Sequence, residues 1–245
     1  SRTSVLAHYG VKTLLYGTLL PGPDIGKRCA SLLRRVRDAG FETGVHCDDH
    51  IRWQDHAAGQ NARWTQREMQ RACDRFEEIF GVPAATHGAA GWQINVHALR
   101  QEQHRGFNYC SDTRGAHPFI PVWNAEILAC PQLPTTLPTL DELIGVGGLM
   151  PHTVAAHLLR LTENPPPTGH VYTLHAELEG MKLAGVFEEL LIGWKRQGYR
   201  LVSLEEYAAD LDPAGLPRHE VVLGEIPGRS GALARQGEAF LAHAF

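Results

Sequence analysis

Apolar residues recur along this chain at two spacings, one typical of helices and one typical of strands. Residues 25–39 place apolar side chains every three or four positions before a glycine, which predicts an amphipathic helix. The apolar-flanked segment 41–46 predicts a strand directly after it. A second amphipathic helix is predicted from Thr65 to Gly81, with Thr65 and Glu68 forming a capping box at its start. Helix and strand therefore alternate in the first third of the chain.

The same alternation continues to residue 206. It predicts helices over 95–105, 151–162 and 184–197, a capping box over 203–206, and extended segments over 83–87, 107–111, 127–130, 171–174 and 199–202. Strands separated by helices favour parallel pairing and an α/β fold. Polar residues follow several of these strands, and the carboxyl ends of the strands form the active face of a (β/α) barrel. A doubly wound open sheet is the alternative, but the glycine-rich phosphate loop expected there is missing from the sequence.

Composition limits the class of protein. The chain has 245 residues, of which 43% are hydrophobic and 20% charged, and this suits one folded domain with a large core. The formal charge of −4 and the lack of a long basic run argue against nucleic acid as the main partner. The five cysteines form no CxxC pair, which fits a reducing compartment better than a disulfide framework. The sequence contains no run of 18 apolar residues, so it predicts no transmembrane helix.

The most informative local pattern is the pair His46 and His50, at the exit of the predicted strand 41–46. One helical turn after the strand would put both imidazoles on one face, where they could bind one divalent metal ion. Two histidines leave coordination positions open, as catalytic metal sites do. Cys47 lies between them, and we expect it to fill space at the strand end, with a ligand role as the alternative. The chain has 14 histidines, so the spacing alone does not establish a site.

Five longer runs occur in an order that resembles the polysaccharide deacetylase superfamily of NodB-type carbohydrate esterases. Within it, the runs are most similar to the 4-deoxy-4-formamido-L-arabinose-phosphoundecaprenol deformylases; they cover residues 44–50, 89–92, 111–115, 138–142 and 175–180. The resemblance extends from about residue 14 to about residue 231. It implies a single domain over residues 1–245 with the fold of a distorted (β/α) barrel.

Carried over by position, the resemblance implies that His46 and His50 bind a divalent metal ion such as Zn²⁺, Co²⁺ or Mn²⁺. His175 would be the general acid that protonates the leaving amine. Asp112 would hold and tune His175, because a nearby carboxylate keeps an imidazole protonated to higher pH.

Three further residues are candidates for contacts with the substrate: Trp92, Arg114 and Glu177. Trp92 is either a wall on which a sugar stacks or a buried core residue. Arg114 is either a ligand for a substrate phosphate or a partner in a salt bridge. Glu177 lies two positions after His175, in the last of the five runs.

The resemblance is incomplete at the beginning of the chain. Members of the superfamily open with a strand that ends in two aspartates, the catalytic base and the third metal ligand. Residues 1–45 contain no adjacent pair of aspartates, and Asp24 is their only acid after a plausible turn. We therefore expect the chain to begin after the first βα unit, with a barrel that is open there. On this interpretation the chain as printed is inactive, although its full-length parent is active.

The expected reaction is a metal-dependent hydrolysis of undecaprenyl-phosphate 4-deoxy-4-formamido-L-arabinose to the free amine and formate, in the modification of lipid A. The resemblance implies a lipid-linked substrate and a peripheral position on the cytoplasmic side of the bacterial inner membrane. Two alternatives remain open: a polysaccharide N-deacetylase of the same superfamily, and an inactive, truncated domain that binds metal. A different metallohydrolase barrel is less consistent with the sequence, because its first strand would carry an HxH pair.

Overall fold

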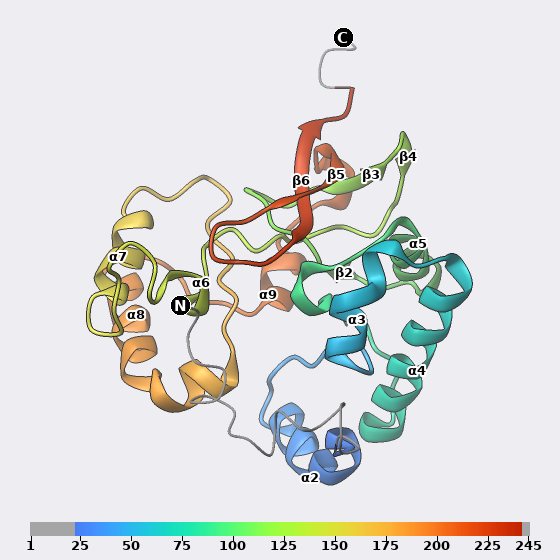
Figure 1. Cartoon of the computed structure of the whole chain (residues 1–245), viewed down its shortest axis with the longest axis horizontal. Coiled ribbons are helices and arrows are strands. Elements are labelled where there is room, and N and C mark those ends of the chain that lie inside the picture. The colour runs from blue at the N-terminus through green and yellow to red at the C-terminus, as the bar shows by residue number, and fades with distance from the viewer. Residues whose placement is uncertain (1–22, 242–245) are drawn as a thin grey trace.

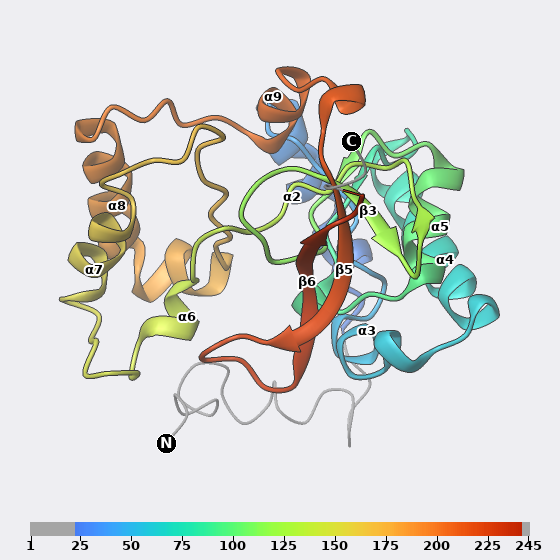
Figure 2. The same cartoon turned by 90° about the horizontal axis from the view of Figure 1, so that it is seen from above.

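The structure, a computed structural model, describes residues 23–241 as an α/β protein in which a long hairpin lies between two groups of helices (Figures 1 and 2). The hairpin consists of β5 (Arg218–Glu225) and β6 (Ala232–Ala239). One group contains α3 (His50–His56), α4 (Ala62–Phe80) and α5 (Val96–Arg105); the other contains α6 (Leu140–Leu143), α7 (Val154–Leu161) and α8 (Ala184–Arg196). The expectation that a first βα unit is missing was drawn from residues 1–45, of which residues 1–22 lie outside the described residues.

Two more helices and four short helical turns complete this arrangement. They are α2 (Ile25–Asp38), α9 (Leu204–Ala209), the 3₁₀ turns η1 (Ala57–Gly59), η2 (Ala90–Trp92) and η4 (Pro213–Gly215), and the π-helical turn η3 (Leu178–Lys182). Most of the predicted helices are confirmed within a few residues. The predicted start of α4 is wrong, because its N-cap is Asn61, whose side chain accepts a hydrogen bond from the Trp64 amide at 3.0 Å. Thr65 is buried inside that helix.

Within residues 23–241 the strands form two separate sheets. Parallel strands β1 (Thr86–His87) and β2 (Tyr109–Cys110) form the first, and Val45 adds a single parallel bridge to His87. The second has the order β4-β3-β5-β6, with β3 (Ile120–Trp123) and β4 (Glu126–Ile127) joined to the hairpin. β3 pairs in parallel with β5, and the other two pairings are antiparallel.

These sheets correct several predicted strands. The segment 41–46 contributes only the bridge at Val45, and the segments 171–174 and 199–202 have no strand pairing. The hairpin of β5 and β6 was not predicted. The described residues form no closed barrel, although the α/β class is confirmed. An apolar run indicates that a segment is buried. Whether the segment also pairs with another strand depends on its neighbours in the fold, which the run does not specify.

Three clusters of buried side chains hold these elements together. The largest lies under α3, α5 and both sheets and includes Trp53, Ile94, Leu99 and Phe119. A second joins α6, α7 and α8, and a third joins α2 and α4. Within residues 23–241, none of the helices is long and apolar enough to cross a membrane.

One edge of the small sheet concentrates polar residues. The bridge at Val45, β1 and β2 run in parallel, so their carboxyl ends meet at the same edge. His46, Gly88 and Asp112 follow these three segments directly or within two residues. The prediction that separate loops come together at the strand ends is confirmed here, even though the strands are much shorter than expected.

Candidate functional site

His46 and His50 lie side by side at this edge. Their ring centroids are 5.2 Å apart, with the ring planes inclined at 57°. The Nδ1–H of His46 can donate to the carbonyl oxygen of Gly88 at 2.6 Å, which would leave its Nε2 lone pair for a ligand. His50 is the first residue of α3, whose N-cap Asp49 accepts a hydrogen bond from the Arg52 amide at 3.0 Å. The predicted proximity of the two imidazoles is therefore seen.

Both imidazoles favour the neutral form that binds metals. Loss of contact with water lowers the pKa of His46 and of His50, although each residue keeps exposed surface. A positive charge on His175 lowers both pKa values further. Cys47, between them in sequence, has a left-handed backbone with φ of 58° and packs against the largest core cluster. Burial and the nearby Asp49 and Asp48 raise the pKa of its thiol to about 12, so it remains protonated.

His175 reaches the same site from the other group of helices. It lies just before the π-helical turn η3, a type of turn that is frequent at functional sites. Its backbone amide donates to Oε2 of Glu179 at 3.0 Å, and Oε1 of the same buried carboxylate accepts from the Tyr172 hydroxyl at 2.9 Å. The Nδ1 atom of His175 lies 3.7 Å from Oδ1 of Asp141. His175 is thus held by its own segment and faces a carboxylate of α6.

Asp112 lies elsewhere than the sequence suggested. It is fully buried, accepts hydrogen bonds from the Ala89 amide at 2.7 Å and Gln132 Nε2 at 3.0 Å, and lies 2.7 Å from Nδ1 of His87. The expected contact between Asp112 and His175 is therefore corrected: the carboxylate next to His175 is Asp141. Asp112 instead fixes the loop whose Gly88 carbonyl accepts from His46.

Trp92 does not offer an exposed ring on which a sugar could stack, because only 5% of the residue is exposed. Its indole Nε1 donates to Thr135 Oγ1 at 3.1 Å. Two guanidinium groups flank the ring, that of Arg114 at 4.7 Å and that of Arg229 at 4.9 Å from its centroid. Arg114 is also buried, and it pairs with Glu142 at 2.5 Å. The structure thus favours the core and salt-bridge interpretations of Trp92 and Arg114.

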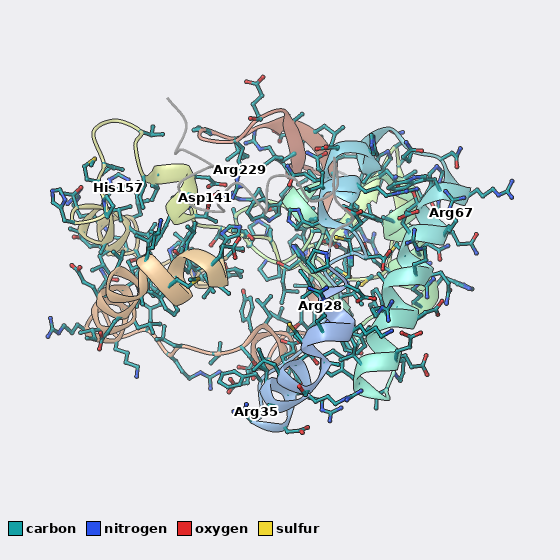
Figure 3. All side chains as sticks on the ribbon, turned by 60° about the horizontal axis from the view of Figure 1, so that its bottom comes forward. Arg28, Arg35, Arg67, Asp141, His157 and Arg229 are labelled. Carbon is teal, nitrogen blue, oxygen red and sulfur yellow. The ribbon has the colours of Figure 1, made fainter. Side chains whose placement is uncertain are left out.

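Arg229 is a residue of the site that the sequence did not reveal. It extends from the turn between β5 and β6 and keeps 21% of its side chain exposed. It pairs with Asp141 at 3.0 Å and with Glu142 at 2.8 Å. Figure 3 shows Arg229 and Asp141 as neighbours where the hairpin turn meets α6. Its only local signal is a position between glycines, which is ordinary for a hairpin turn.

The hairpin turn and α6 are in backbone contact at Gly228. Its φ is +87°, and a Cβ atom built there would lie 2.6 Å from the backbone oxygen of Glu142. Glu177, the last predicted contact, is exposed at the start of η3, and its charge offsets part of the lowering of the His50 pKa that burial causes. The site therefore joins His46 and His50 to His175, Asp141 and Arg229 from two other parts of the chain.

Sequence comparison identifies relatives over most of this chain. The probable 4-deoxy-4-formamido-L-arabinose-phosphoundecaprenol deformylase ArnD of Shewanella sediminis (strain HAW-EB3) is 36% identical over 235 residues, covering 96% of this chain and 75% of the relative. The probable deformylase of the same name from Wigglesworthia glossinidia brevipalpis is 30% identical over 232 residues, covering 93% and 79%. No family model matches the chain.

Solved structures share the fold. A protein of Mycobacterium smegmatis proposed to be a polysaccharide deacetylase has a TM-score of 0.62 at 19% identity, with 83% of this chain and 74% of that chain covered. A probable polysaccharide deacetylase of Pseudomonas aeruginosa PAO1 has a TM-score of 0.55 at 18% identity, covering 75% and 63%. The mixed α/β arrangement is thus one that polysaccharide deacetylase structures also have.

Proposed function

Since this chain belongs to the family of the 4-deoxy-4-formamido-L-arabinose-phosphoundecaprenol deformylases, within the polysaccharide deacetylase superfamily, we propose that it is built to hydrolyse a formyl amide. The substrate is undecaprenyl-phosphate 4-deoxy-4-formamido-L-arabinose, and the products are the free amine and formate. The observation that carries this proposal is the meeting of His46, His50 and His175 at one edge of the small sheet.

The two histidines fit a divalent metal ion such as Zn²⁺, Co²⁺ or Mn²⁺. His46 keeps Nε2 available when its Nδ1–H donates to Gly88, and the lowered pKa of both imidazoles favours the neutral, metal-binding form. When bound, such an ion polarises the carbonyl and lowers the pKa of water. Two imidazoles are too few protein ligands for a catalytic metal ion, so we propose that a further ligand comes from outside residues 23–241.

His175 protonates the departing nitrogen in this proposal. Asp141 lies 3.7 Å from its Nδ1, so it faces that side of the ring and leaves Nε2 for the substrate. Arg229 contacts both oxygens of the Asp141 carboxylate, Oδ2 at 3.0 Å and Oδ1 at 3.2 Å, and this fixes the orientation of Asp141 beside His175. Glu177 is exposed beside His50 and is our candidate for a contact with the sugar.

A lipid-linked substrate agrees with the surface around His175. Leu174 is 43% exposed and Met181 is 69% exposed, and both lie in the segment that carries His175. Apolar side chains at such positions suit an undecaprenyl chain better than a polysaccharide. We therefore propose that the protein acts as a peripheral protein at the cytoplasmic face of the inner membrane, in the modification of lipid A.

This proposal assigns the catalytic base to none of residues 1–45. Residues 1–45 have no adjacent pair of aspartates, and we propose that the chain as printed is inactive or nearly so for that reason. The test uses an extended protein, defined here as this chain with a first βα unit of the family, including its two aspartates, placed ahead of Ser1. The proposal requires the extended protein to release formate from the formamido sugar faster than it releases acetate from the matching acetamido sugar. Preference for the acetamido compound, or for a polysaccharide, would favour a deacetylase instead.

A further inference from the structure

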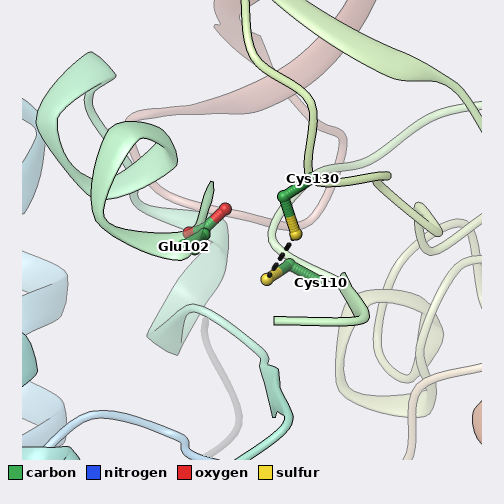
Figure 4. Close-up of side chains that lie close together, drawn as sticks. All are labelled: Glu102, Cys110 and Cys130. Carbon is green, nitrogen blue, oxygen red and sulfur yellow. Dashed lines mark hydrogen bonds between the residues drawn. The ribbon is translucent and has the colours of Figure 1, made fainter. Parts of the chain in front are cut away.

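A second group of ligand-type side chains lies in the core, separate from His46 and His50. It consists of Glu102 on α5, Cys110 at the end of β2 and Cys130 after β4 (Figure 4). One ligand atom from each of the three lies within 4.8 Å of the other two. The two sulfur atoms are 3.6 Å apart, and the three residues are between 0% and 4% exposed.

The surroundings of Glu102 carry an excess of buried negative charge. Asp112 and Glu102 both lie near a single buried imidazole, at 2.7 Å and 3.6 Å from Nδ1 of His87. Even a protonated His87 can balance only one of the two carboxylates. A buried carboxylate oxygen without a hydrogen-bond partner is costly unless it is protonated or binds a further group such as a cation.

Glu102 has the unused capacity that such a cation needs. Its Oε1 atom is buried, lies 3.6 Å from Nδ1 of His87 and has no hydrogen-bond partner among the described residues, while Oε2 accepts from Gln132 Nε2 at 3.2 Å. The same Gln132 amide group donates to Asp112 at 3.0 Å. Gln132 thus fixes the Glu102 carboxylate from one side, as partners of metal ligands often do.

We propose that Glu102, Cys110 and Cys130 form a structural site for a thiophilic divalent cation such as Zn²⁺. Zinc binds thiolate sulfur at about 2.3 Å in tetrahedral geometry, so two such sulfurs lie roughly 3.8 Å apart. The observed 3.6 Å needs little adjustment. Binding releases the protons of the two thiols, and the two thiolates balance the charge of the ion. Glu102 then supplies an oxygen ligand, and the net charge of the cluster stays as it was before binding. A water molecule or a backbone oxygen supplies the fourth ligand.

Two simpler arrangements compete with this site. In one, the cysteines remain a pair of thiols: Cys130 donates to the Phe107 carbonyl at 3.5 Å, and burial raises the pKa of the Cys110 thiol. In the other, they form a disulfide, which requires the sulfurs to close from 3.6 Å to about 2.05 Å and an oxidant to reach a buried position.

The test uses cobalt as a probe whose spectrum identifies sulfur ligands. The chain is produced with His46→Ala and His50→Ala in Co²⁺-supplemented medium and purified under reducing conditions, so that the ion can enter while the core forms. We expect about one equivalent of bound Co²⁺ and a sulfur-to-cobalt charge-transfer absorption. Adding Cys110→Ser and Cys130→Ser removes the absorption. Adding Cys73→Ser, a cysteine outside the cluster, leaves it unchanged.

A second measurement keeps the proposal falsifiable if the double serine variant does not fold. X-ray absorption of the zinc-loaded His46→Ala, His50→Ala protein needs no cysteine change. It should show two sulfur neighbours at about 2.3 Å from the metal. A folded protein that binds no metal, binds it with nitrogen and oxygen neighbours only, or contains a Cys110–Cys130 disulfide would overturn the proposal. None of these outcomes depends on whether the chain is a deformylase.

Discussion

The Oδ1 atom of Asp141 lies 3.7 Å from the Nδ1 atom of His175, and the two residues belong to segments more than thirty positions apart. This distance is longer than a hydrogen bond, so a small movement on substrate binding is enough to form one. Arg229 already contacts both oxygens of Asp141, and Oδ1 also accepts a hydrogen bond from the Thr139 hydroxyl at 2.5 Å. The relationship gives the proposed acid its orientation and its charge partner.

Replacing Asp141 with Asn should slow deformylation by the extended protein. The amide keeps the shape of the carboxylate but removes the charged partner that faces Nδ1 of His175. A general acid contributes about 10²–10⁴-fold, and this variant keeps the acid but loses the group that positions it, so we expect kcat/KM to fall about 10-fold. Steady-state kinetics of formate release would measure it.

The matched control for this change is Asp210→Asn, an exposed carboxylate that also pairs with an arginine, Arg200, but lies far from the site in sequence. It should leave kcat/KM unchanged. An Asp141→Asn variant with unaltered kinetics over a range of pH would show that Asp141 does not act on His175.

Gly228 offers a test of the contact between the hairpin turn and α6. A side chain at this position must adopt a φ of +87° and meets the Glu142 backbone at 2.6 Å. Gly228→Ala should therefore lower the free energy of unfolding by about 2–4 kcal/mol, from backbone strain and overpacking together. Urea denaturation would measure this loss.

Gly231 in the same turn provides the comparison. Its φ is +76°, but a Cβ atom there meets nothing within 4 Å. Gly231→Ala should thus cost only about 1–2 kcal/mol, the backbone strain alone. Equal losses for the two variants would mean that the turn does not rest closely on Glu142.

Because His87 is buried beside Asp112, we expect the free energy of unfolding of the metal-free protein to depend on pH. The pKa of His87 is raised to about 10, above the usual value of 6.5. The stability that this gives is fully present below pH 6.5 and is lost as the pH rises through 10. Burial and the charge of Asp112 also raise the pKa of Glu102, and a raised carboxyl pKa likewise favours the folded state more at lower pH.

Unfolding free energies measured between pH 6.5 and 9, with a chelator present, test this prediction. The wild-type value should fall with pH, by up to about 1.4 kcal/mol per pH unit for the His87 proton. In His87→Gln the fall should be shallower, whatever the absolute stability of that variant. Parallel curves for the two proteins would show that His87 is not held protonated by Asp112.

The sequence predicted those parts of the fold and site that depend on local signals. α2, α4 and α5 have periodic apolar faces, and His46 and His50 come together because α3 begins one turn after the small-sheet edge. Strand lengths were overestimated, because an apolar run can be buried without joining a ladder. The hairpin of β5 and β6 was missed because its residues are largely polar and exposed.

The residues around His175 could not be predicted for a different reason. Asp112 and Asp141 both lie in runs that resemble the family, and order along the chain does not show which carboxylate faces a given imidazole. The structure directs Asp112 toward His87 and Gln132 and brings Asp141 to His175. Arg229 reaches the site from the turn between β5 and β6, and the position of this turn depends on the packing of Gly228 against α6. Such pairings are set by tertiary structure.

The most direct test of the central claim is formate release from undecaprenyl-phosphate 4-deoxy-4-formamido-L-arabinose, measured with excess Zn²⁺, Co²⁺ or Mn²⁺. The extended protein should release formate, and the chain as printed should be slower by about 10²–10⁴-fold, because residues 1–45 contain no adjacent pair of aspartates to supply the proposed base. In the extended protein, His50→Ala and His175→Ala should each reduce the rate by at least about 100-fold. Comparable rates for the two proteins, or an extended protein whose rate survives both substitutions, would contradict the account.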